Sequence, residues 1–198
     1  MTTIYFATNR NLVTSNDLEA GFDFGSTFSQ DGLANLRFGK AEVTGENFSQ
    51  YQIQVAPENL LGDPPVLGSQ AIALQVRKQM IENAEDTLIF IHGFNVSFRS
   101  ALTAAAQLHQ VLTTKDPNDT EPPLKLNICL FSWPSDGALL FSDPKAANAI
   151  AYKNDRLDAA ASGAAFARGF LKVADFINQT EARCRQRLHL TAHSMGNY

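Results

Sequence analysis

Ser194 lies in the pentapeptide Ala192-His-Ser-Met-Gly196, directly after a short apolar run. The pentapeptide is a variant of G-x-S-x-G with Ala at the first small position. A serine nucleophile on a very tight strand-to-helix turn requires small residues two positions before and after it. The pattern therefore predicts that Ser194 is a nucleophile on a turn built by Ala192, His193 and Gly196, with the Met195 N–H facing a developing oxyanion. Alternatively, Ser194 only caps the next helix.

A second motif, His92-Gly-Phe-Asn95, follows another apolar run. A hydrolytic site of this kind takes its second oxyanion donor from the loop after the strand beside the nucleophile strand. Gly93 allows a close turn, and we expect the N–H of Phe94 to be that donor, with His92 and Asn95 supporting the loop. A structural alternative is an ordinary turn in which His92 bonds to nearby backbone.

Both motifs need strands to position them, and the second half of the chain has an alternating pattern. Continuous apolar runs predict three buried strands of a parallel sheet, and helical spacing predicts the segments between them. The expected strands are Thr87–Ile91, Leu126–Phe131 and Leu188–Ala192, and the helices are Phe98–Leu112 and Pro144–Gln179, the second with a break near Gly163 as an alternative. Strand, helix, strand, helix, strand indicates an α/β fold.

The first half is less regular. We expect strands at Ile4–Thr8, Leu36–Thr44 and Tyr51–Val55 and a helix at Ser69–Asn83. Asn9-Arg-Asn11 is predicted as a polar turn, followed by an ordered loop through Gly32. The whole chain, 1–198, is expected to form one domain, with N-terminal strands and a first helix in 1–85 and the parallel part in 86–198.

Four motifs together resemble a bacterial branch of the α/β-hydrolase superfamily whose members are of unknown function. They are Ile91-His-Gly-Phe-Asn95, Phe131-Ser-Trp-Pro-Ser135, Tyr152 with Asp155, and Ala192-His-Ser-Met-Gly-Asn197. The resemblance is strongest from Asp86 onward. It implies a mostly parallel central sheet flanked by helices, Ser194 as nucleophile, and Phe94 with Met195 as oxyanion donors. It does not supply a substrate.

Three aromatic or acidic residues lie near the expected site. Trp133 follows the second buried strand, and ligands bind beyond the carboxyl ends of such strands. Trp133 therefore either lines a substrate pocket or packs under the loop. Tyr152 and Asp155 are expected to bind each other or the nearby loops, in a structural role.

None of the four histidines is a convincing general base. His92 belongs to the loop, His109 to a helix, His189 to a strand interior, and His193 should point away from the Ser194 hydroxyl. In this superfamily the acid and then the histidine follow the nucleophile along the chain. We therefore expect an N-terminal portion that lacks both groups and is nearly inactive unless a C-terminal half joins it in trans.

Composition excludes several classes of protein. The formal net charge is −4 without a dense basic run, which argues against nucleic acid. No apolar stretch approaches a membrane span of roughly 20 residues, and we expect the first residues to form a strand and not a signal peptide. We expect a cytoplasmic location, no cofactor and no metal, and self-association through an exposed sheet edge as a further interaction.

Three functions follow from these patterns. The first is a serine hydrolase for small esters or thioesters, and lipase, amidase or peptidase chemistry would use the same residues. The second is a non-catalytic binding or assembly module on a hydrolase scaffold, favoured by the missing acid and base. A nucleotide-binding α/β protein is least favoured, because His92-Gly-Phe-Asn95 has a single glycine where a phosphate loop needs several.

Overall fold

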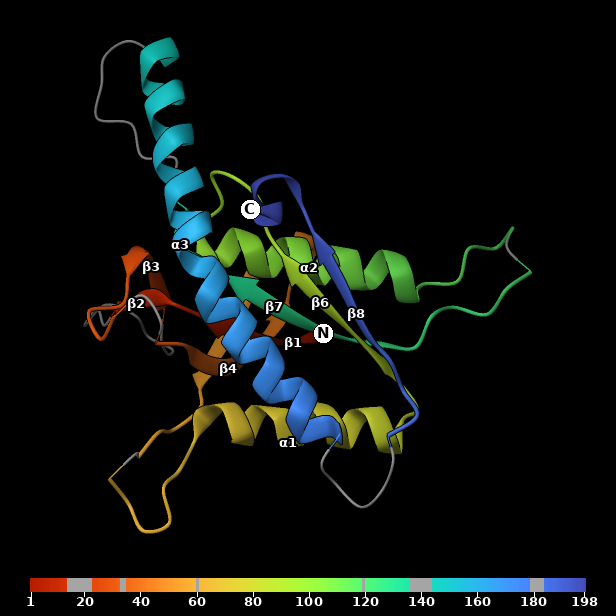
Figure 1. Ribbon diagram of the computed structural model, residues 1–198. Helices are drawn as coiled ribbons and strands as arrows, with labels where there is room; N and C mark the ends of the chain where they lie inside the picture. Colours follow the sequence, from red (N-terminus) through yellow and green to blue (C-terminus); the bar gives the residue numbers. More distant parts are fainter. Residues whose placement is uncertain (14–22, 33–34, 60, 119, 136–143, 179–183) are drawn as a thin grey trace.

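The structure is a computed structural model that describes residues 1–13, 23–32, 35–59, 61–118, 120–135, 144–178 and 184–198, the side chains of 144–149 and 177–178 excepted. Its centre is a sheet with the strand order β5-β4-β1-β7-β6-β8 (Figure 1). The strands are β1 (Thr2–Thr8), β4 (Arg37–Thr44), β5 (Gln50–Val55), β6 (Asp86–Ile91), β7 (Leu126–Ser132) and β8 (Leu188–Ala192).

Four neighbouring strands run parallel, which confirms the predicted α/β sheet. β1 pairs with β7, β7 with β6, and β6 with β8, all in parallel, whereas β4 is antiparallel to both β1 and β5. The register places Ile91 opposite Phe131 on one side and Ala192 on the other. The carboxyl ends of β6, β7 and β8 therefore meet in one row, which is where both sequence motifs begin.

Helices cover both faces of the sheet. They are α1 (Gly68–Glu82), α2 (Phe98–Thr113) and α3 (Pro144–Asn178), with short 3-10 turns η1 (Glu46–Phe48) and η2 (Ser194–Asn197). α2 packs on the face that carries Ile4, Phe6 and Leu130, while α1 and α3 contact each other on the opposite face. In Figure 1, α2 (green) and α1 (yellow) lie on opposite sides of the strands.

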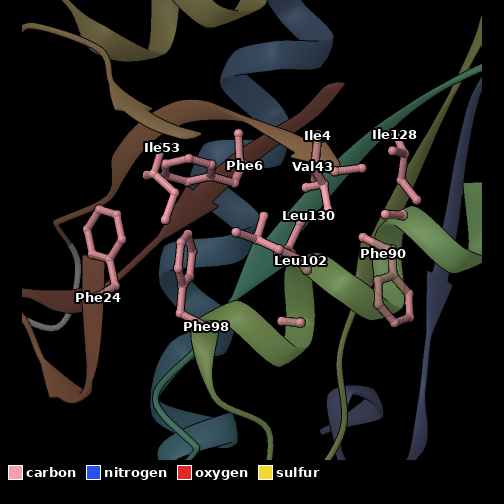
Figure 2. Close-up of a cluster of buried hydrophobic side chains, with 14 of the residues drawn as sticks. Ile4, Phe6, Phe24, Val43, Ile53, Phe90, Phe98, Leu102, Ile128 and Leu130 are labelled. Atoms are coloured by element: carbon pink, nitrogen blue, oxygen red, sulfur yellow. The ribbon is translucent and has the colours of Figure 1, made fainter. Parts of the chain in front are cut away.

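The larger core lies under α2 and is built around three phenylalanine rings (Figure 2). Phe98, the first residue of α2, packs edge-on against Phe6 with ring centres 5.1 Å apart and lies 4.8 Å from the ring of Phe24. Such edge-to-face contacts add to the free energy of apolar burial. Because Phe98 follows the loop after β6, this cluster also anchors the start of α2 beside the candidate site.

The N-terminal region differs from the sequence prediction. Arg10–Val13 forms a strand, β2, where a polar turn was predicted, and it pairs with β3 (Asp23–Phe28) inside the predicted loop. The reason is tertiary, because the side chain of Arg10 is only 1% exposed and its polar partners come from distant segments.

Two further expectations need correction. α3 is one continuous helix, without a break at Gly163. β8 was predicted as an apolar, buried strand that forms an exposed sheet edge; it does lie at the edge, but it is not buried, since Leu190 is 54% exposed. An apolar run fits a strand that is covered on both faces, but the run by itself does not reveal which strands lack a neighbour.

We predict that the two free cysteines differ strongly in reactivity. Burial raises the pKa of the Cys129 thiol to about 12, and its remaining accessible surface faces a small apolar cavity between the sheet and the helices. Since the thiolate is the reactive form, Ellman's reagent at pH 8 should modify Cys184 fast and Cys129 only upon unfolding. Cys184→Ser should abolish the fast phase and Cys129→Ser should not. Two fast thiols would contradict this assignment.

Candidate active site

The chain turns sharply at Ser194, immediately after β8. Ser194 has φ of 52°, in the left-handed region that costs an L-residue roughly 1–2 kcal/mol. Asn197 supports the turn from below, because its Nδ2 donates to the carbonyl oxygens of Ala192 at 3.2 Å and Ser194 at 2.8 Å. Ser194 is exposed and Met195 is buried. The turn therefore presents Ser194 to solvent, while the buried side chain of Met195 packs it against the protein.

Gly196 is required by a close approach to the neighbouring strand. A Cβ at this position would lie 2.6 Å from the carbonyl oxygen of His92 and 2.9 Å from Cγ2 of Ile91. The first atom belongs to the backbone and cannot rotate away. The small residue that the pentapeptide pattern demands therefore lets the turn after β8 lie directly against the end of β6.

The loop His92–Asn95, named the oxyanion loop after the role that the sequence predicts for it, touches the turn at Gly93. A Cβ on Gly93 would lie 2.7 Å from Nδ1 of His193 and 3.0 Å from Cβ of Ser194. Asn95 also adopts a left-handed conformation, with φ of 55°. The structure thus brings together the two motifs that the sequence placed about one hundred positions apart.

Two backbone donors at this junction have no acceptor among the described residues. Within the described part of the chain, neither the N–H of Phe94 nor that of Met195 donates a hydrogen bond to another residue. Unpaired backbone N–H groups are uncommon away from water. These are the two N–H groups that the sequence predicted as oxyanion donors.

His92 is held as a neutral structural group. Its Nδ1 lies 2.9 Å from the carbonyl oxygen of Gly93, which can only accept, and its Nε2 lies 3.1 Å from Oγ of Ser132. Burial, together with the charge of Arg10, lowers the pKa of His92 to about 3. A histidine with that pKa stays unprotonated at neutral pH, and its ring is already committed to the loop.

Trp133 packs beneath the oxyanion loop. Its side chain is 1% exposed, its Nε1 donates to the carbonyl oxygen of His92 at 3.0 Å, and its ring stacks on the His92 ring with centres 5.1 Å apart. This geometry favours the packing role over an open pocket wall. The ring also borders a hollow of about 370 Å³ between β8 and α3, beside Gly196.

Arg10 is a site residue that sequence reasoning missed. Its Nε donates to Oγ of Ser132 at 2.9 Å, its Nη1 to the carbonyl oxygen of Gly25 at 2.9 Å, and its Nη2 to the carbonyl oxygen of Val96 at 2.6 Å. A lone arginine between two asparagines carries no local signal of burial, since arginine is seldom fully buried. Nothing in the local pattern could have identified it.

Asp155 and Tyr152 bind the loop, as expected, and not each other. Oδ2 of Asp155 accepts from the N–H of Asn95 at 3.2 Å and from Oγ of Ser135 at 2.5 Å. The Tyr152 ring packs on Phe94, with ring centres 5.5 Å apart. Sequence reasoning paired these residues with the loops but could not say which atoms they contact.

The described contacts place no histidine as a base for Ser194. His109 Nε2 donates to the carbonyl oxygen of Leu126, and His189 Nε2 lies 2.9 Å from Oδ2 of Asp86, near the amino end of β8. His193 is exposed, and its ring makes no hydrogen bond to the Ser194 hydroxyl within the described residues. All four histidines of the chain are described, and none of them makes a hydrogen bond to Ser194.

Comparison with known proteins gives one match. A family model described as "Alpha/beta hydrolase of unknown function (DUF900)" matches residues 69–198. No curated protein and no solved structure matches the chain. Among the described helices, none combines the length and the apolar character that a membrane span requires. Throughout the described part of the chain, no group of three or more His, Cys, Asp or Glu side chains is placed to hold a metal ion.

Proposed function

Because the chain belongs to this family of α/β hydrolases of unknown function, we propose that it is a serine hydrolase for carboxylic esters or thioesters. The reaction passes through an acyl-serine intermediate on Ser194. The N–H groups of Phe94 and Met195 stabilise the oxyanion that forms when the substrate carbonyl is attacked.

The contact between the turn and the oxyanion loop carries this proposal. Ser194 is exposed at φ of 52°, and Gly93 lies so close that an added Cβ would come within 3.0 Å of the Ser194 Cβ. The two N–H groups next in sequence, Phe94 and Met195, make no hydrogen bond to the described protein. A serine hydroxyl beside two unused backbone donors is the arrangement that stabilises a tetrahedral oxyanion.

The chemistry has two steps. Oγ of Ser194 forms a bond to the substrate carbonyl carbon, its proton passes to a base, and the alcohol or thiol leaves with a proton. Water then attacks the acyl-serine, and the acid leaves as Ser194 regains its proton. Backbone donors at Phe94 and Met195 act in both steps, because each step passes through an oxyanion.

Residues 1–198 alone are proposed to react slowly. The four histidines are engaged elsewhere or do not bond to Ser194, and a serine without a base is a weak nucleophile. Oxyanion stabilisation and binding without the full set of catalytic groups leave an acceleration on the order of 10³-fold over water. Acid and histidine from another segment or chain would raise the rate further.

A fluorophosphonate probe tests the proposal, because phosphonylation forms a bond between Oγ of Ser194 and phosphorus and releases fluoride. We expect slow stoichiometric labelling, measured by intact mass, and a single adduct on the peptide that contains Ser194. Urea-denatured chain should not label. An adduct distributed over several serines, or none at all, would refute the proposal.

Since no histidine bonds to Ser194 in the part of the chain that the structure describes, a second candidate is also favoured, a non-catalytic binding or assembly module. β8 is an edge strand with Leu190 exposed, and such edges pair with other chains. Folded chain that resists the probe but sediments as a concentration-dependent oligomer would support this candidate over the hydrolase.

A further inference from the structure

Asp155 is a buried carboxylate that α3 places over the oxyanion loop. Asp155 is only 1% exposed to solvent. Figure 1 shows α3 crossing the sheet and extending past it at the end where β8 leads to the chain terminus. Asp155 lies in α3 three residues, or about one turn, after Tyr152.

The carboxylate organises two consecutive backbone N–H groups. Oδ2 of Asp155 accepts directly from the N–H of Asn95 and from the hydroxyl of Ser135. Oγ of Ser135 in turn accepts from the N–H of Val96 at 3.3 Å. Asp155 therefore determines where both N–H groups point, one by direct contact and one through a hydroxyl.

Arg10 holds the same segment from the other side. Its Nη2 donates to the carbonyl oxygen of Val96 at 2.6 Å. The segment Asn95–Val96 thus lies between a buried carboxylate on α3 and a buried guanidinium on β2. Asp155 bonds to the N–H of the peptide that joins Phe94 to Asn95, whereas Arg10 bonds two peptides further along, at the carbonyl oxygen of Val96.

A buried carboxylate is an expensive way to fill space. Desolvation costs several kcal/mol per ion, and well-packed apolar residues are often equally stabilising. Its advantage is directional, since it keeps Asn95 at φ of 55° and fixes the orientation of the peptide plane. The ring of Tyr152, on the preceding turn of α3, contacts Phe94 itself. Tyr152 and Asp155 on α3 therefore contact two neighbouring loop residues, Phe94 and Asn95.

We propose that Asp155 is a positioning residue that holds the oxyanion loop in the shape from which Phe94 presents its N–H to the oxyanion. The inference rests on the proposed function of Ser194 and Phe94. Asp155 touches neither substrate nor nucleophile and acts through the backbone of Asn95.

Labelling kinetics of the folded chain with the fluorophosphonate probe provide the first test. Asp155→Ala should lower the maximal rate of Ser194 labelling about 10²-fold, the loss expected of a misplaced reacting group, with an unchanged half-saturating probe concentration. Asp155→Asn retains an acceptor oxygen and should recover most of the rate. Asp175→Ala, an exposed position on the same helix, is the control. Equal rates for wild type and Asp155→Ala would overturn the inference.

Amide hydrogen exchange gives a test that does not depend on labelling. In wild type the N–H groups of Asn95 and Val96 should exchange slowly, and in Asp155→Ala they should exchange at least tenfold faster while β6 and β7 stay protected. If Asp155→Ala does not fold, Ser135→Ala should accelerate Val96 alone. If Asp155→Ala leaves the exchange of the Asn95 and Val96 N–H groups unchanged, the role of Asp155 is overturned. If the variant does accelerate this exchange but wild-type chain never reacts with the probe, only the proposed hydrolase function is refuted.

Discussion

The Ser194→Ala variant is expected to label with the fluorophosphonate probe no faster than the urea-denatured chain, a loss of at least 10²-fold. The substitution removes one oxygen atom and leaves the left-handed backbone at φ of 52° as it was, because Ala and Ser carry a similar penalty there. The oxyanion loop and η2 keep their contacts. The thermal midpoint should therefore move little, and a lost label would report chemistry and not unfolding.

A second serine serves as the control for this variant. Ser26 on β3 is exposed and remote in sequence from both motifs. Ser26→Ala should label at the wild-type rate on the Ser194 peptide. Ser194→Ala that still labels as fast as wild type would show that another side chain attacks the probe.

Gly93→Ala is expected to produce the next largest effect, a fall in labelling rate of about 10² to 10³-fold. The added methyl group would lie 2.7 Å from Nδ1 of His193, 3.0 Å from Cβ of Ser194 and 3.1 Å from the carbonyl oxygen of His193. The His193 ring can rotate away, but the other two atoms belong to the turn. The loop and the turn must move apart, which withdraws an oxyanion donor, and the loss of one donor has that magnitude.

Two matched variants isolate this cause. Gly163→Ala adds the same methyl group inside α3, where a Cβ would meet no atom within 4 Å; it should stabilise the helix by about 0.5–1 kcal/mol without changing the labelling rate. Adding His193→Ala to Gly93→Ala removes the ring and should not restore labelling. Full recovery in that double variant would mean that the loop and turn still fit together.

Local patterns in the sequence determined much of the fold and the candidate site. Apolar runs bounded by turn residues predicted β6, β7 and β8 to within a residue or two, since a buried strand must be apolar over its whole length. Ala192 and Gly196 predicted a tight turn at Ser194, because a larger side chain two positions before or after the serine would clash in such a turn. Gly93 was identified in the same way, from its position after a strand.

Contacts between distant segments were decided only by the tertiary structure. Arg10 was predicted in a polar turn and is buried against Val96, 86 positions away; Asp155 reaches Asn95 across 60 positions. β8 was predicted as an apolar edge strand with buried residues, and at that edge Leu190 is 54% exposed. Periodicity and turn chemistry depend on neighbours along the chain, whereas burial of a charge and the neighbour of a strand depend on which segments meet in space, and no local pattern records that.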